Sequence, residues 1–349
     1  CASDRDGDGL SDCVETNTGR FIDASDTGTD PDFADTDADG IPDGEEVLGS
    51  ETGLDLAALG ANPLRRDLLV EYDWFDSDYD CGPHSQRPTA AVMQRVAAMF
   101  AAAPVTNPDG STGIHLIQDY GQGGVFSGGN RVEGHDAILP AAIDATFHEI
   151  KLGNFAPERL GYFRYVLMPH RYNGGSNSSG FAEVVGDDAI VSLYCLNTED
   201  NVARTIAHEI GHLLGLHHGG FEVCNNKPNY NSLMNYRYQF SGVDAQCDAQ
   251  GDPMVDDFSR GTLLSLDERA LDEPLGVCGS RAIDWNRDGT LQTAISLKLT
   301  PNDTDTCGSE LRTLEDFDDW ANLSFAGLRD FRGELKSVQS HTQCAGAEP

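Results

Sequence analysis

The spacing of apolar residues divides the chain into two parts. Residues 1 to about 60 are rich in Asp and Gly and have few large apolar side chains, so they cannot form a hydrophobic core unaided. At residues 62–75 the segment NPLRRDLLVEYDWF places an apolar run between polar flanks, which is the pattern of a buried strand. We therefore expect a small N-terminal unit at residues 1–60 and a globular domain at residues 61–349.

Helical and strand-like patterns alternate in the first half of the globular domain. Helical spacing occurs at about residues 89–102 and 141–151, and strand patterns occur at 113–119, at 162–168 and twice within 181–193. This alternation predicts an α/β (α+β) fold in which helices pack on a sheet.

A longer helix is predicted at residues 201–216. It separates an N-terminal lobe at about residues 61–218 from a C-terminal lobe at about 219–349, where short mixed elements predict an irregular structure. The apolar residues on one side of this helix are Val202, Ile206, Ile210, Leu213 and Leu214.

The predicted helix carries the sequence HEIGHLLGLHH from residue 208 onwards. Residues four apart on a helix share one face, so His208 and His212 can direct ring nitrogens at one zinc ion. Gly215 can adopt the left-handed conformation that ends a helix, and the chain then turns back to bring His218 to the same ion. Water in the fourth zinc position has a pKa of about 7, so Glu209 could take its proton.

Two alternatives bear on this zinc site. A helix that merely carries histidines would have to place three of them, a glutamate and a glycine in register by chance, so we favour the metal site. A shift of the turn by one residue would present His217 as the third ligand, but the spacing favours His218.

The extended motif H-E-x-x-H-x-x-G-x-x-H resembles that of the metzincin clan of zinc endopeptidases. Another feature of that clan is a methionine-containing turn beneath the metal, and the sequence NSLMNY offers Met234 for it. Tyr236 matches the tyrosine that astacin- and serralysin-like members bring towards the metal. The resemblance covers about residues 67–236 and implies a twisted mixed sheet, an active-site helix and an irregular C-terminal lobe. It also implies peptide hydrolysis by zinc-bound water, with Glu209 as general base; core packing is the alternative role for Met234 and Tyr236.

Two loops of the N-terminal unit have the ligand spacing of a calcium site. The segments DRDGDGLSDCVE and DTDADGIPDGEE each carry acidic residues at positions 1, 3, 5, 9 and 12 of an EF-hand-like loop, with Gly9 or Gly40 at the sharp turn. A solvated acidic loop is the alternative, but two complete copies favour calcium. The loops resemble thrombospondin type 3 repeats, which implies that bound calcium replaces a hydrophobic core. The ten expected ligands are Asp4, Asp6, Asp8, Asp12, Glu15, Asp35, Asp37, Asp39, Asp43 and Glu46.

A third acidic stretch, DWNRDG, begins at residue 284. Asp284, Asn286 and Asp288 occupy its first three ligand positions, but Ile295 stands where a calcium loop has its bidentate Glu. This loop is therefore a doubtful calcium site, and whether it binds calcium stays open.

The net charge of the chain argues against two classes of binding partner. The 58 acidic and 23 basic residues give a formal net charge of −35, which argues against binding to nucleic acid or to an anionic membrane. No run of about 18 apolar residues occurs, so we expect no membrane insertion. We expect a monomer that acts on a protein or peptide substrate.

Nine cysteines are dispersed along the chain without any C-x-x-C pair, which fits disulfides formed in an oxidising compartment. The sequence begins at Cys1 with no initiator methionine and no apolar signal segment, so we expect an upstream leader to have been removed. This favours a secreted or cell-surface protein of bacterial origin. The odd count leaves one cysteine over, and a lipid anchor at Cys1 is the alternative to free secretion.

The leading hypothesis from the sequence is a secreted zinc endopeptidase with a calcium-binding module. One alternative is a calcium-dependent adhesion or binding protein with a non-catalytic protease-like domain, against which the intact Glu209 and three histidines argue. Another is a zinc hydrolase that acts on a non-peptide bond, against which the methionine turn argues.

Overall fold

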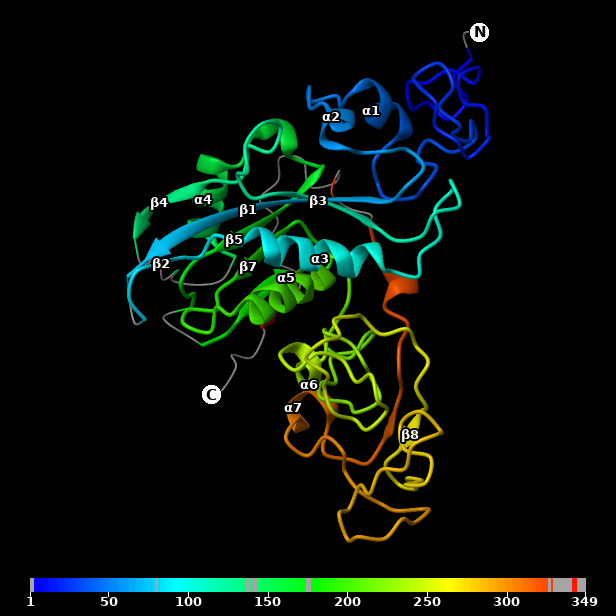
Figure 1. Ribbon diagram of the computed structural model, residues 1–349, viewed down its shortest axis with the longest axis vertical. Coiled ribbons are helices and arrows are strands. Elements are labelled where there is room, and N and C mark those ends of the chain that lie inside the picture. Colours follow the sequence, from blue (N-terminus) through cyan, green and yellow to red (C-terminus); the bar gives the residue numbers. More distant parts are fainter. Residues whose placement is uncertain are drawn as a thin grey trace.

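The computed structural model consists of a sheet-containing body, an N-terminal unit at one end and an irregular lobe at the other (Figure 1). The described residues are 3–78, 81–135, 139, 143–173, 177–325, 328 and 341–343. Cys1, the site of a lipid anchor in the alternative to free secretion, therefore lies outside the described residues.

A mixed sheet forms the centre of the body. Within the described residues its eight strands follow the order β10-β6-β7-β5-β1-β2, and β3 and β4 also pair with β1. Strands β3, β4 and β5 run parallel to β1, and β7 runs parallel to β5, whereas β2, β6 and β10 pair antiparallel with their neighbours. The bounds are β1 Asp67–Ser77, β2 His84–Ser85, β3 His115–Asp119, β4 Arg131–His135, β5 Phe163–Met168, β6 Gly180–Glu183, β7 Asp188–Val191 and β10 His341–Gln343. The predicted α/β (α+β) class is confirmed.

Strand β1 is buried on both faces because its side chains alternate between two cores. Leu68, Val70 and Tyr72 join the core beneath helices α3 (Ala90–Ala101) and α5 (Glu199–Leu213). Leu69 and Phe75 join the opposite core, which contains residues of helix α4 (Ala145–Asn154) and of the short helix α2 (Leu56–Leu59). The sheet therefore lies between two layers of helices, as Figure 1 shows.

Helix α5 is enclosed by the sheet body on one side and the C-terminal lobe on the other. The side chain of Thr198 caps its first turn by accepting a hydrogen bond from Asn201 N. All residues from Val202 to Leu213 are buried, including the polar ones. Arg204 links the helix to the C-terminal lobe, because its guanidinium donates to Asp256 Oδ1 at 2.7 Å and to Phe240 O at 2.7 Å.

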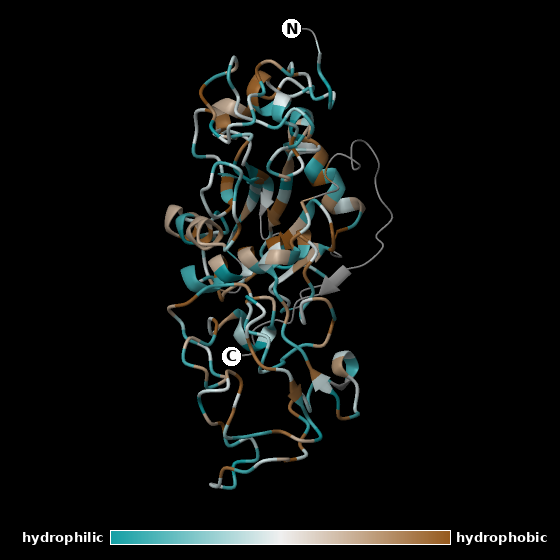
Figure 2. Cartoon of the chain, turned by 90° about the vertical axis from the view of Figure 1, so that its right-hand side faces the viewer, coloured by the Kyte–Doolittle hydropathy of each residue, from teal (hydrophilic) through white to brown (hydrophobic). Residues whose placement is uncertain are grey.

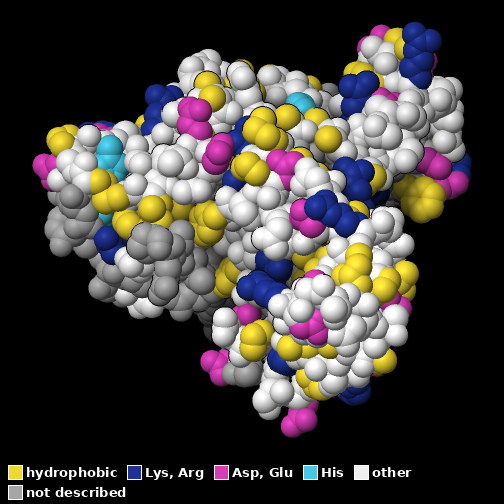
Figure 3. All heavy atoms as spheres, turned by 60° about the horizontal axis from the view of Figure 1, so that its bottom comes forward, with side chains coloured by type: hydrophobic (Ala, Val, Ile, Leu, Met, Phe, Trp, Pro, Cys, Tyr) yellow, Lys and Arg dark blue, Asp and Glu magenta, His cyan; other side chains and the backbone are white. Residues whose placement is uncertain are grey.

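The N-terminal unit touches the sheet through its second half. Helix α1 (Asp43–Leu48) follows the second acidic loop, and Ile41, Leu56 and Leu59 are buried in the same core as Leu69 of β1. The first acidic loop lies further out, and Figure 3 shows this end of the molecule as a projection at the upper right.

The C-terminal lobe has little regular structure, as predicted. Its short elements are α6 (Tyr236–Gln239), β8 (Leu266–Asp267), α7 (Thr304–Cys307), β9 (Thr313–Leu314) and the 3-10 turn η2 (Trp320–Asn322), and a further 3-10 turn, η1 (Pro157–Arg159), lies in the body. Figure 2 shows long coil segments here, with apolar residues spread singly along them. A small core around Leu266, Val277 and Leu314 holds the lobe together.

Disulfides join segments that are distant in sequence. Cys224 pairs with Cys307 and Cys247 with Cys278 in the C-terminal lobe, whereas Cys81 pairs with Cys195 in the body. Cys13 is also disulfide-bonded. Among the helices of the described residues, none combines the length and apolar character needed to cross a membrane.

Candidate functional site

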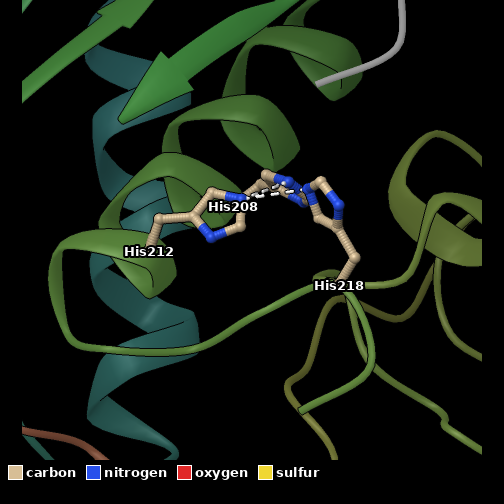
Figure 4. A group of neighbouring side chains, drawn as sticks. All are labelled: His208, His212 and His218. Carbon is tan, nitrogen blue, oxygen red and sulfur yellow. Dashed lines mark hydrogen bonds between the residues drawn. The ribbon is translucent and has the colours of Figure 1, made fainter. Parts of the chain in front are cut away.

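Three histidines converge beside helix α5. His208 and His212 project from one face of the helix, and His218 comes from the loop that follows it (Figure 4). His212 Nε2 lies 3.1 Å from His208 Nε2 and 3.1 Å from His218 Nε2. All three side chains are buried, and one ring nitrogen of each lies close enough to the others for a shared metal ion.

The backbone fixes the protonation of two of these rings. His208 Nδ1 is 2.7 Å from Leu233 O, and His212 Nδ1 is 2.7 Å from Leu216 O. A carbonyl oxygen only accepts, so each Nδ1 carries the hydrogen and each Nε2 presents a lone pair. Burial lowers the pKa of His208 to about 4, and it also lowers the pKa of His212 and of His218 well below the ordinary value. Neutral imidazoles with fixed Nδ1–H groups are suited to binding a metal through Nε2.

The end of helix α5 brings the third histidine into place. Helix α5 ends at Leu213, and Gly215 has a φ of +95°, a conformation that strains residues with a Cβ. A tight turn follows, in which His217 N donates to Gly220 O at 3.0 Å. The structure places His218 in the group of three, whereas His217 is only half-buried and does not belong to it.

Glu209 is fully buried on the same helix, directly after His208. Its carboxylate lies against the backbone of β6, because a Cβ added to Gly180 would come within 2.0 Å of Glu209 Oε1. The carboxylate therefore sits between the helix and the β6 side of the sheet. Gly180 was not singled out in the sequence, where it reads as one more glycine of a Gly- and Ser-rich segment.

Met234 lies directly beneath the helix that carries the histidines. Its side chain is fully buried, and a Cβ added to Gly211 would lie 2.3 Å from Met234 Sδ. The preceding Leu233 supplies the carbonyl that holds His208. Gly211 thus allows the close approach of the turn to the helix, and its position inside the H-E-x-x-H motif was the signal that could have revealed it.

Tyr236 is the residue of the turn that faces the histidines. Its ring centroid is 4.2 Å from that of His218 and 5.9 Å from that of His208. Tyr236 N donates to Oδ1 of the buried Asn225 at 2.9 Å, so this asparagine, which the sequence did not single out, fixes the start of α6.

The acidic residues of the first loop gather in two overlapping groups. Asp4, Asp6 and Asp8 form one, and Asp8, Glu15 and Asp43 form the other, with one oxygen of each residue within 4.8 Å of the others in its group. Asp43, which the spacing assigns to the second loop, thus lies with residues of the first loop. The Oδ1 atom of Asp12 accepts a hydrogen bond from Arg5 N at 2.9 Å.

The second loop brings Asp35, Asp37 and Asp39 together, and Asp39 also groups with Glu46. The loop is folded around Asp35, because Ala38 N and Gly40 N donate to its carboxylate at 2.8 and 2.9 Å.

Burial of so many carboxylates changes their protonation. Desolvation, followed by repulsion from neighbouring carboxylates, raises the pKa of Glu15 to about 7. Desolvation raises the pKa of Asp43 to about 7, and burial together with like charges raises the pKa of Asp37, Asp39 and Glu46. In the absence of a cation, these loops favour protonated carboxyl groups at neutral pH.

The third acidic stretch is closed by hydrogen bonds. The buried carboxylate of Glu273 accepts from Trp285 N at 2.7 Å and from Gln292 N at 2.9 Å. Asp288 Oδ2 accepts from Asn286 Nδ2 at 3.1 Å. Amide donors thus hold this loop, with Ile295 at the position where calcium would need Glu.

The chain shows little similarity to known proteins. No protein-family model matches the chain, and no curated protein matches it. Among solved structures, the chain is similar to archaemetzincin (amzA) from Methanopyrus kandleri, with 14% sequence identity, a TM-score of 0.29, and coverage of 55% of this chain and 90% of that chain. A likeness this weak does not bear on function.

We predict that Gly211→Ala disturbs the histidine group. The new methyl group must displace Met234 in a fully buried turn, which should lower stability by about 1–3 kcal/mol. Thermal unfolding and zinc content measured on the purified protein would test this. Gly153→Ala near the end of α4 is the matched control, because nothing lies within 4 Å of that added methyl. Unchanged unfolding and zinc content in Gly211→Ala would contradict the prediction.

Proposed function

We propose that the protein is a zinc-dependent endopeptidase in which His208, His212 and His218 hold the metal. The observation that carries the proposal is the convergence of three buried ring nitrogens, two of which the backbone fixes as lone-pair donors. Three imidazoles with one further position for water form the ligand set of catalytic zinc. The alternative of a non-catalytic adhesion protein gives no reason for a buried glutamate beside such a site.

Zinc bound to these residues would acidify a water molecule and polarise the carbonyl group of the scissile peptide bond. Glu209 would accept the proton of that water and pass it to the leaving amine as general base and then general acid. The lack of a side chain at Gly180 leaves the space that this carboxylate occupies. Met234 would support the metal-binding helix from below without taking part in proton transfer.

We predict that Glu209→Gln abolishes peptidase activity while the zinc content stays at the parent level. The amide keeps the size of the carboxylate but cannot take up the proton, so turnover should fall by about 10²- to 10⁴-fold. Digestion of an unbiased peptide library, with metal analysis of the same samples, measures both effects. Glu149→Gln on the exposed side of α4 is the control and should cleave normally. Cleavage by Glu209→Gln at the parent rate would show that the assigned mechanism is wrong.

Tyr236 would act on the transition state. Its ring lies beside His218, and its phenol could donate a hydrogen bond to the oxygen on which negative charge develops. Stabilisation limited to the transition state affects turnover more than substrate binding.

We predict that Tyr236→Phe lowers kcat by about 10²-fold while KM changes little, since only the hydroxyl group is removed. Steady-state kinetics on a peptide substrate would measure this, with zinc content as the test of site integrity. Tyr120→Phe, after strand β3, serves as the control. An unaltered kcat in zinc-loaded Tyr236→Phe would return Tyr236 to a packing role.

We further propose that calcium binds the two acidic loops. Glu15 Oε2 and Asp37 Oδ2 are buried without a hydrogen-bond partner among the described residues. Carboxylate oxygens at this spacing are the ligands that calcium prefers. Export to an oxidising compartment, where calcium is abundant and disulfides persist, fits the three described cysteine pairs, and we expect the enzyme to work there as a monomer.

We predict that calcium protects the N-terminal unit mainly at neutral pH. Without calcium, Glu15 and Asp43 have pKa values of about 7 in the folded protein but about 4 in the unfolded chain. The folded unit binds more protons over that interval, so its stability falls as the pH rises from about 4 to about 7. Limited proteolysis of Glu209→Gln protein, with and without calcium, should show rapid cleavage within residues 3–48 only without calcium at about pH 7.5 and not at about pH 5. Equal resistance in all four conditions would contradict the prediction.

A further inference from the structure

The second acidic loop contains a carboxylate that the repeat spacing does not include. Asp67, the first residue of β1, groups with Asp39 and Glu46, and one oxygen of each lies within 4.8 Å of the others. Strand β1 is the central strand that pairs with β3 and β5. The group therefore joins the N-terminal unit to the middle of the sheet.

We propose that the calcium ion of the second loop is also bound by Asp67 and thereby clamps the N-terminal unit onto the central sheet. The ion would be shared by Asp35, Asp37, Asp39 and Glu46 on the loop side and by Asp67 on the sheet side. This inference rests on the proposed calcium loops but not on the proposed peptidase activity.

Unpartnered buried oxygens point into this group. The side chain of Glu46 is 1% exposed, and neither of its carboxyl oxygens accepts a hydrogen bond from an N–H or hydroxyl donor of the described structure. It lies within hydrogen-bonding reach of the carboxyl group of Asp67, a second acidic group. Asp37 is 2% exposed, and its Oδ2 is also without a partner. Buried carboxylates without donors are costly, so the missing partner has to be a cation or a proton.

The charge around the group identifies the kind of cation. Among the described residues, only His115 comes within ion-pair distance of it, with Nδ1 at 2.6 Å from Asp67 Oδ1. The buried guanidinium of Arg164 acts on Asp39 from beyond ion-pair distance. These two positive charges leave most of the five carboxylates unbalanced, whereas a divalent ion removes two charges at once. The donors are all oxygens, which selects a hard ion such as calcium over zinc.

The loop is already held in register on the strand. Asp67 N donates to Asp39 Oδ2 at 2.7 Å, and Arg66 Nε donates to Asp37 O at 2.8 Å. Asp67 Oδ2 accepts from Asn62 N at 2.7 Å, which fixes the carboxylate. These contacts place the carboxylate of Asp67 beside those of the loop, so that an ion bound there can reach both.

The first loop follows the same rule. Its group of Asp8 and Glu15 is completed by Asp43, which comes from the segment after it. Each ion would then bind one carboxylate from the segment that follows its loop. For the first ion this is Asp43, and for the second it is Asp67, which belongs to the sheet.

The test uses the full-length chain with zinc present, titrated with calcium in a calorimeter and unfolded thermally with and without calcium. Asp67→Asn should weaken calcium binding at one site by about tenfold or more, because a charged ligand is lost. It should also reduce the calcium-induced rise in melting temperature. In calcium-free buffer it should melt no lower than the parent, since one of several repelling charges has been removed. Equal losses with and without calcium would overturn the proposal.

The control variant is His115→Ala, which removes the partner of Asp67 but keeps the carboxylate. It should retain the full calcium-induced rise in melting temperature, whereas Asp67→Asn should show a smaller one. If the parent binds no calcium, the loops themselves are wrongly assigned. If the parent and Asp67→Asn bind calcium equally, only the clamp is wrong.

A measurement on the unsubstituted protein makes the test independent of how Asp67→Asn folds. Calcium should slow hydrogen exchange at residues 67–71 and 115–119 as well as at residues 35–46, because β1 and β3 pair over that register. Protection confined to residues 3–48 would overturn the clamp.

Discussion

Electron-rich atoms that converge in a buried place repel one another unless a positive charge lies between them. The fold contains two kinds of such convergence, and its arrangement depends on both. Beside helix α5 the converging atoms are imidazole nitrogens, and in the N-terminal unit they are carboxylate oxygens. Repulsion between uncharged lone pairs is mild, but carboxylates in a low-dielectric interior repel strongly. The N-terminal unit should therefore depend on its ions for stability at neutral pH, where its carboxyl groups lose their protons, whereas the histidine site can form in advance.

The histidine site is positioned by residues that have no side chain. Gly211 lets Met234 approach the helix, and Gly180 leaves the space that the carboxylate of Glu209 fills. Gly215 supplies the positive φ at the end of the helix. The chemical groups are thus fixed by the absence of atoms at three neighbouring positions, as much as by hydrogen bonds. A side chain at Gly211 or Gly180 would displace Met234 or Glu209. A side chain at Gly215 would strain the turn that leads to His218.

The sequence predicted what is local and missed what depends on long-range contact. The alternating pattern of β1 and the long helix with His208 and His212 follow from periodicity, because it reports burial within one element. The role of Asp67 could not be predicted, because an Asp that precedes an apolar run looks the same in the sequence whether it only begins a strand or also binds an ion. The cysteine pairs were equally hidden, because eight cysteines alone permit 105 pairings. Asp43 lies between these cases, since its spacing marked it as a ligand of the second loop, whereas only the folded chain shows that its carboxylate also groups with Asp8 and Glu15 of the first loop.

The ligand atoms of the two kinds of site also explain how one chain could bind zinc at one place and calcium at another. Three neutral imidazoles bind zinc well but offer calcium none of the charged oxygens that it needs, and the acidic loops offer oxygens without nitrogen or sulfur. Exposed acidic side chains and buried acidic side chains therefore contribute differently to the net charge of −35. Part of it is exposed on the surface, where acidic side chains lie in small groups on the face seen in Figure 3. The remaining acidic side chains are buried in the loops, where cations would neutralise them. With its metals bound, the protein would therefore carry a smaller negative charge than its sequence indicates. Solubility and substrate attraction then depend on the exposed part alone, whereas folding of the N-terminal unit depends on the buried part.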